Sequence, residues 1–144
     1  MIVVDTNVIV RGIRSGASAS GFILRALLLG EIRFAISPAM ILEYEDVLKR
    51  PGVLAPLILS TDQIDAILDA LCRMAHCVTP WFRYRPLLED PKDDLYIECA
   101  VAAGADVIIS HDRHFQNPEM GKLGLRVMSA REYVIEYRNL RSSQ

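Results

Sequence analysis

Two short apolar runs each lead into a carboxylate. Residues 2–4 (IVV) are followed directly by Asp5, and residues 107–109 (VII) lead to Asp112. Short runs rich in β-branched residues predict buried strands of a parallel sheet. Because ligands bind beyond the carboxyl ends of such strands, Asp5 and Asp112 are expected at one functional edge. Taken alone, each Asp is explained equally well by a turn or, for Asp5, by helix capping.

A third carboxylate interrupts an apolar helical stripe. Ser37 is a good N-cap and Pro38 a good first helical residue, so a helix is expected from there to about residue 50. Glu43 occupies a position of the stripe that should be apolar. A carboxylate that faces the core is costly unless it is paired or coordinated. Glu43 is therefore a candidate ligand, and the alternative is a stripe edge where it reaches water.

A fourth carboxylate lies on the apolar face of a later helix, which is expected over residues 90–103 and is ended by Gly104. Asp90 is the expected N-cap, and Asp93 lies one turn before the apolar residues of that face. Asp93 also suits the helix dipole at its third position, which is the structural alternative. Asp94 replaces Asp93 if the helix phase is off by one residue.

Together these four acids predict a metal site. Like charges that share a pocket need compensation, and the sequence places no Lys or Arg among them. An all-oxygen site suits Mg²⁺ or Mn²⁺, which activate water and stabilise charge on phosphate. The pattern therefore predicts phosphodiester hydrolysis. His111 and His114 lie near the last acid but have no partner at metal-binding spacing, so we interpret them as solvated or supporting residues.

The elements that must position these acids alternate along the chain. Strands separated by helices predict an α/β fold with a parallel sheet covered on both faces. The expected strands cover 2–4, 34–36, 77–79, 107–109 and 125–128, and the expected helices cover 20–29, 38–50, 62–75, 90–103 and 130–140.

Composition limits the class of protein. The 144 residues suit one domain over 1–144, and the 51% hydrophobic content excludes a disordered chain. A net charge of −2 argues against a strongly basic nucleic-acid coat. No apolar run is long enough to span a membrane, and the first residues do not form a signal peptide, so a cytoplasmic protein is expected. The three cysteines, Cys72, Cys77 and Cys99, are expected to be buried thiols in a reducing compartment.

Four segments of the chain are similar to motifs of the PIN-domain ribonucleases. Residues 4–8 (VDTNV) resemble the first-strand motif, and residues 37–48 resemble the segment that carries the second acid, here Glu43. Residues 90–106 resemble the segment of the third acid, here Asp93, and residues 109–112 (ISHD) resemble the motif of the last acid. Each motif is weak alone, but their order is specific. The chain most resembles the VapC-type toxins of toxin–antitoxin pairs.

The resemblance implies a three-layer α/β/α sandwich with a central parallel sheet and an Mg²⁺- or Mn²⁺-dependent endoribonuclease of single-stranded RNA. It also implies frequent homodimers and a small antitoxin that occupies the active-site groove. Asp5, Asp93 and Asp112 would be metal ligands, and Glu43 would complete the site and orient water. The supporting residues would be Thr6, Asn7, Asp94 and Ser110. His111 and His114 depart from the family pattern, which leaves the number of metals and the activity level open.

Basic residues near these motifs are candidate RNA contacts. Arg11 and Arg14 follow the first motif, and Arg83 and Arg85 alternate with aromatic residues in 81–85. The alternative for 81–85 is a loop whose rings pack on the domain and whose arginines are solvated. The helix at 62–75 serves either the core or a dimer interface.

Two other functions remain open. One is a phosphatase with Asp5 as nucleophile, although residues 5–7 (DTN) lack the second Asp of an Asp-x-Asp motif. The other is a non-catalytic PIN-like module that binds RNA or a protein through the same groove, against which the complete acid set argues.

Overall fold

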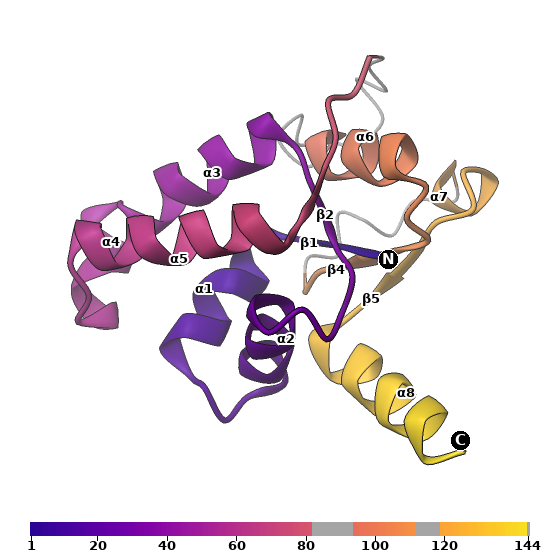
Figure 1. Ribbon diagram of the computed structural model, residues 1–144, viewed down its shortest axis with the longest axis horizontal. Coiled ribbons are helices and arrows are strands. Elements are labelled where there is room, and N and C mark those ends of the chain that lie inside the picture. Colours follow the sequence, from indigo (N-terminus) through magenta and orange to yellow (C-terminus); the bar gives the residue numbers. More distant parts are fainter. Residues whose placement is uncertain (82–93, 112–118, 144) are drawn as a thin grey trace.

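A computed structural model describes residues 1–81, 94–111 and 119–143 of the chain (Figure 1). Helices and strands alternate along much of it, as the sequence predicts. The elements in chain order are β1 (Ile2–Val4), α1 (Thr6–Arg14), α2 (Ala19–Leu28), β2 (Ala35–Ile36), α3 (Pro38–Leu48), α4 (Pro51–Leu57), α5 (Thr61–Met74), β3 (His76–Cys77), α6 (Asp94–Ala103), β4 (Val107–Ile109), α7 (Glu119–Lys122), β5 (Arg126–Met128) and α8 (Ala130–Ser142).

All the strand pairs described are parallel. One sheet has the order β1-β4-β5, and a second pairs β2 with β3. A parallel bridge between Ile2 and Phe34 links the two sheets beside β1. Parallel neighbours need crossover connections, and helices provide them here. The predicted α/β class with a parallel sheet is therefore confirmed.

The sheet is covered on both faces, which explains why its strands β1 and β4 are apolar throughout. Every residue of β1 and β4 is buried. In Figure 1, α6 lies on one side of these strands, and α1, α2 and α8 lie on the other. Strands buried on both faces lack the polar alternation of a half-exposed sheet. No helix among the described residues is both long and apolar enough to span a membrane.

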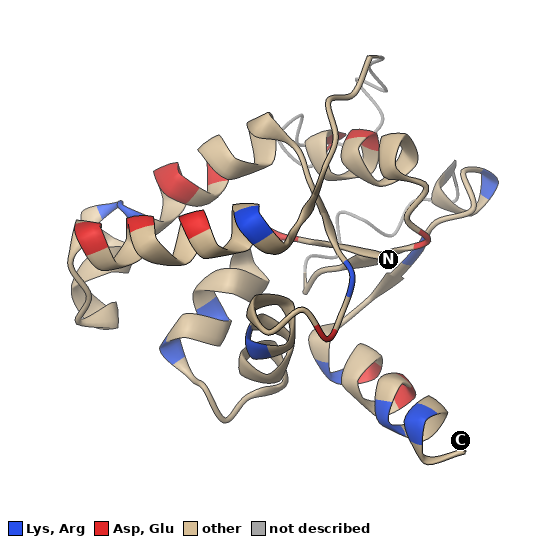
Figure 2. Ribbon diagram, viewed as in Figure 1, with Lys and Arg blue, Asp and Glu red and all other residues tan. Residues whose placement is uncertain are grey.

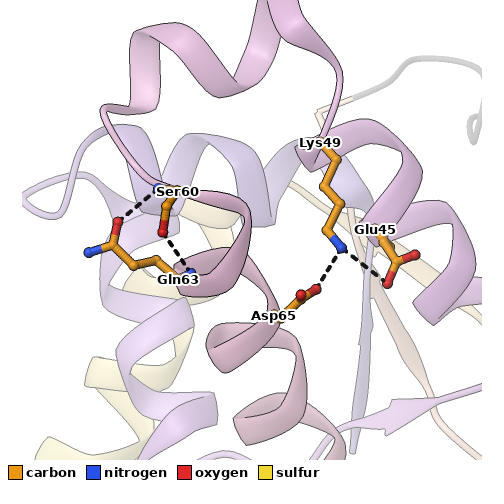
Figure 3. Close-up of polar contacts among 5 residues, drawn as sticks. All are labelled: Glu45, Lys49, Ser60, Gln63 and Asp65. Carbon is orange, nitrogen blue, oxygen red and sulfur yellow. Dashed lines mark hydrogen bonds and ion pairs between the residues drawn. The ribbon is translucent and has the colours of Figure 1, made fainter.

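The serine cap predicted for α3 is present, and a second serine caps α5. The Ser37 hydroxyl accepts a hydrogen bond from the Met40 N–H at 3.2 Å, with Pro38 in the first turn of α3. Ser60 and Gln63 form a reciprocal capping box at the start of α5, with distances of 3.1 and 2.8 Å (Figure 3). These bonds satisfy N–H groups that have no partner inside a helix.

An ion pair joins α3 to α5 and so helps to position the helix that carries Glu43. The Lys49 ammonium lies 2.6 Å from Asp65 Oδ1 and 3.7 Å from Glu45 Oε2 (Figure 3). The hydrogen bond to Asp65 raises the pKa of Lys49 above its usual value. The interaction is close to solvent, so it specifies the contact between the helices more than it stabilises the fold.

Three helices were not predicted from the sequence. α1 has a β-branched, glycine-containing sequence with low helix propensity, and its buried face packs against α2, so tertiary packing decides its conformation. α4 begins at Pro51 and contains Pro56, a composition that favours a loop. The third, α7, spans only four residues, Glu119–Lys122, too few for a periodic pattern.

The prediction for the cysteines was wrong for two of the three. Cys99 on α6 is fully buried as expected, whereas Cys72 is half-buried and Cys77 is exposed. Cys77 lies in β3, which has β2 as a neighbour on one side and lies at the end of its sheet. β3 starts one residue earlier than predicted, and both of its residues are exposed. The apolar neighbours of Cys77 in the sequence therefore do not indicate burial.

Candidate active site

Asp5 and Ser110 lie side by side at the carboxyl ends of β1 and β4. The register pairs Val4 with Ile109, and the Asp5 N–H donates to the Ile109 carbonyl at 3.0 Å. The Ser110 hydroxyl donates to Asp5 Oδ2 at 2.8 Å, and both residues are about 95% buried, with 4% and 5% exposed. A buried carboxylate needs such donors. The structure thus brings these two predicted residues together at the predicted edge of the sheet.

Asp5 does not cap α1 with its side chain. It occupies the N-cap position with extended backbone angles, φ −65° and ψ 149°, yet its carboxylate makes no capping hydrogen bond. An Asp at this position normally accepts from the second or third helical N–H. Here the Val8 N–H bonds to the Asp5 carbonyl instead, at 3.0 Å. The capping explanation for the Asp5 carboxylate is therefore wrong.

Two tyrosines that sequence reasoning did not assign to the site also lie here. The Tyr44 hydroxyl donates to the Val4 carbonyl. The Tyr96 hydroxyl accepts from the Thr6 N–H at 3.3 Å and also bonds the Thr6 hydroxyl. In the sequence, both tyrosines match apolar helical stripes. The available signal was chemical, since a buried tyrosine needs a partner for its hydroxyl.

The electrostatics place Glu43 in the same neighbourhood. Burial raises the pKa of Tyr96 above its usual range, and the charges of Asp5 and then Glu43 raise it further. Burial also raises the pKa of Tyr44, with smaller contributions from Tyr96 and Asp5. Glu43 is half-buried on α3, beside the fully buried Tyr44. Two of the four predicted acids, one directly after β1 and one on α3, therefore both raise the pKa of Tyr96 on α6.

The helix α6 carries two further buried acids. Asp94 is fully buried and Glu98 is 7% exposed, one helical turn apart. Glu98 was missed because it lies within an otherwise apolar run. Several predicted residues lie outside the described part of the chain, namely Asp90, Asp93, Asp112 and His114, together with the candidate RNA contacts Arg83 and Arg85.

The described residues supply only part of the predicted metal site. Among residues 1–81, 94–111 and 119–143, no group of three Asp, Glu, His or Cys side chains lies close enough to hold a metal ion. Two of the four predicted ligands, Asp93 and Asp112, are not in these ranges. The described groups at this edge, the Asp5 carboxylate and the Ser110 hydroxyl that donates to it, offer oxygen. Oxygen is the donor type that Mg²⁺ and Mn²⁺ prefer.

Exposed polar side chains lie along α1, the helix that starts at this edge. Asn7, Arg11 and Arg14 are exposed, and Figure 2 shows basic segments on α1 and acidic ones along α3 and α5. Burial, followed by the positive charge of Arg11, lowers the pKa of His111. His111 Nε2 lies 3.4 Å from the hydroxyl of the buried Ser20. Arg11 thus lies near the residue that follows Ser110.

A family comparison agrees with this fold. A model described as the PIN domain matches residues 1–114, which include Asp5, Glu43 and Ser110 as well as Asp93 and Asp112. No curated protein and no solved structure matches the chain. The match covers well over half of the sequence and ends before α7, β5 and α8. The chain therefore belongs to the PIN-domain family, whose members are nuclease-type domains.

Proposed function

We propose that this protein is a divalent-metal-dependent endoribonuclease that cleaves single-stranded RNA. One observation carries the proposal. The Asp5 carboxylate is buried at the carboxyl edge of the sheet, held by Ser110 and not used to cap α1. A buried carboxylate that lies at such an edge and does not cap the helix is typical of a ligand-binding site. Membership of the PIN-domain family supports the same chemistry.

In this proposal Asp5, Asp93 and Asp112 hold Mg²⁺ or Mn²⁺, and Glu43 completes the site and orients the attacking water. A bound divalent cation supplies Lewis-acid stabilisation of the charge that develops on the phosphate. Ser110 keeps the Asp5 carboxylate directed along the sheet edge. Thr6, Asn7 and Asp94 are the remaining supporting residues.

Basic side chains hold the RNA backbone in the same proposal. Arg11 and Arg14 are exposed on α1, the helix that starts directly after Asp5. Their guanidinium groups are suited to bidentate contacts with phosphate. Arg83 and Arg85 are proposed as further contacts from the sequence pattern alone. Substitution of these arginines should weaken RNA binding and reduce its dependence on salt.

We further propose that the protein is the toxin of a toxin–antitoxin pair and acts in the cytoplasm as a homodimer. The motif order that resembles VapC-type toxins supports this role. A short reading frame that overlaps or adjoins the gene is the expected genomic observation. Co-expression of its product should block cleavage by covering the active site. A nuclease that stays active with every neighbouring gene product would contradict the toxin role.

Cleavage of a panel of structured and unstructured RNAs, with Mn²⁺, Mg²⁺ or EDTA, tests the proposed activity. We expect metal-dependent cleavage of unstructured RNA that Asp5→Asn abolishes without unfolding the protein. Asp106→Asn is the matched control, because Asp106 precedes β4 at the opposite end of the sheet, with a side chain 69% exposed. Full activity of Asp5→Asn in EDTA would refute the proposal. Metal-dependent RNA binding without cleavage would favour a non-catalytic module, and a trapped aspartyl-phosphate would favour a phosphatase.

A further inference from the structure

Two buried hydroxyls hold the backbone on either side of Asp5. Tyr44, from α3, donates to the carbonyl of the residue before it, Val4. Tyr96, from α6, accepts from the N–H of the residue after it, Thr6, and also bonds the Thr6 hydroxyl. Each tyrosine is only 2% exposed, so water cannot readily replace either bond. Two helices distant in sequence therefore hold the same three-residue segment.

The hydrogen bond between Tyr96 and the Thr6 N–H provides one of the acceptors needed at the start of α1. The first N–H groups of a helix have no intrahelical partner, and an Asp at the N-cap normally satisfies one of them. In this structure Tyr96 bonds the Thr6 N–H, and the Asp5 carbonyl bonds the Val8 N–H at 3.0 Å. The Asp5 carboxylate makes no capping bond and accepts from Ser110 instead. Tyr96 thus takes over part of the capping function.

The bond from Tyr44 continues the ladder along β1. The neighbouring strand β2 ends at Ile36, because Ser37 is the N-cap of α3. The carbonyl of Val4 lies at the carboxyl end of β1, where a buried acceptor without a donor would be costly. The hydroxyl of Tyr44 supplies that donor. Helix α3 thereby fixes the last residue of β1 as well as presenting Glu43.

We propose that Tyr44 and Tyr96 are positioning residues, which direct the Asp5 carboxylate away from the start of α1 and toward a divalent cation. The inference rests on the proposed function and extends it to two residues that touch neither metal nor RNA. Loss of the Tyr96 hydroxyl leaves the Thr6 N–H without its partner, so the first turn of α1 needs another acceptor. Asp5 occupies the N-cap position, and its carboxylate can then turn to accept from the N–H groups of this first turn. A carboxylate turned toward the helix is a poorer ligand, so metal affinity should fall.

Both phenols are suited to this role at neutral pH. Burial raises the pKa of Tyr44 and of Tyr96 above the usual value, and the negative charge of Asp5 adds to the effect. A phenol is protonated at neutral pH even without this shift, and the Tyr44 hydroxyl donates to the Val4 carbonyl. A neutral hydroxyl beside Asp5 also adds no further negative charge to a site that already contains carboxylates.

Mn²⁺ binding to the metal-free protein, followed by electron paramagnetic resonance, tests the inference without relying on activity. The variants are Tyr44→Phe and Tyr96→Phe, each of which removes one oxygen and keeps the ring. The control is Tyr133→Phe on α8, whose ring stacks on Tyr137 away from the site. We expect each test variant to bind Mn²⁺ about 10-fold more weakly than the control, as is usual for groups that orient a ligand. Excess Mn²⁺ should restore cleavage with an unchanged KM for RNA.

The outcomes separate this inference from the proposed function. Wild-type Mn²⁺ affinity in both Tyr44→Phe and Tyr96→Phe overturns the positioning role, provided that Asp5→Asn loses the metal. Wild-type affinity in Asp5→Asn overturns the proposed function itself. If one tyrosine variant does not fold, the other still decides the question, because the two bonds come from different helices. Loss of kcat that excess Mn²⁺ does not restore would also contradict the positioning role.

Discussion

Removal of the Ser110 hydroxyl tests whether the buried Asp5 carboxylate depends on it. In the folded protein this hydroxyl donates to Asp5 Oδ2 at 2.8 Å, with 4% of Ser110 and 5% of Asp5 exposed. A hydrogen bond to a charged group contributes about 1.5–3 kcal/mol to stability. Ser110→Ala keeps the strand conformation and the backbone bond from the Ser110 N–H to the Met128 carbonyl at 2.9 Å. The substitution should therefore remove the hydrogen bond to Asp5 while it keeps the backbone in place.

For a domain of this length, that loss corresponds to a Tm lower by about 4–10 °C in metal-free buffer at neutral pH. Thermal unfolding followed by circular dichroism measures the shift. Ser142→Ala is the matched control, because Ser142 is exposed near the end of α8 and should change Tm by no more than about 1–2 °C. If Ser110→Ala unfolds at the temperature of this control, the Asp5 carboxylate does not depend on Ser110, and the reasoning about the site is refuted.

Three further predictions concern the elements around the site. Gly12→Ala should lower the free energy of unfolding by about 1–3 kcal/mol, because a Cβ there would lie 2.8 Å from a backbone oxygen of α2. The control is Gly52→Ala, which should cause no such loss because no atom lies within 4 Å of a Cβ at that position. Equal unfolding curves for the two variants would contradict the prediction. Ser60→Ala should lower the free energy of unfolding by about 1 kcal/mol, because it removes the capping box of α5. Chemical denaturation measures this change, and an unchanged midpoint would show that the capping box does not stabilise the protein. Iodoacetamide should modify the exposed Cys77 in the native protein but should modify Cys99 only after unfolding. The reason is that burial raises the pKa of Cys99 to about 12 and so suppresses the reactive thiolate. Modified Cys99 in mass spectra of the native protein would contradict this prediction.

Much of the fold could be predicted from local sequence. The strands β1 and β4 follow from short β-branched runs, and α3 follows from a serine cap placed before an apolar stripe. Gly104 ends α6 with a φ of +70°, as a glycine after a helix often does. These features are local, because the residues that determine them are neighbours in the sequence.

Among the helices that were missed, α1 depends on packing and hydrogen bonds between different segments of the chain. α1 has low intrinsic helix propensity, and its helical form depends on contact with α2 and on partners for its first N–H groups. Its first partner is Tyr96, which is 90 residues away in the sequence. No pattern within residues 6–14 records that interaction. The exposure of Cys77 cannot be predicted from its neighbours in the sequence either, because it depends on whether another strand covers β3.

The candidate site divides in the same way. Asp5 could be found because a carboxylate directly after a buried strand violates the local pattern, and Glu43 because it interrupts a stripe. Tyr44 and Tyr96 could not, because a tyrosine in an apolar stripe is ordinary until its hydroxyl has a specific partner. The acid Glu98 was hidden by the apolar residues around it, although its burial on α6 makes it as unusual as Glu43.

Anomalous scattering from manganese-soaked crystals would test the central claim most directly. The claim predicts a manganese peak within about 2.5 Å of an Asp5 carboxylate oxygen, at the carboxyl ends of β1 and β4, with other carboxylates completing the coordination. The same crystals of Asp5→Asn should lack that peak. Manganese bound elsewhere in the wild-type crystals, with none at Asp5, would contradict the assignment of this edge of the sheet as a metal-dependent nuclease site.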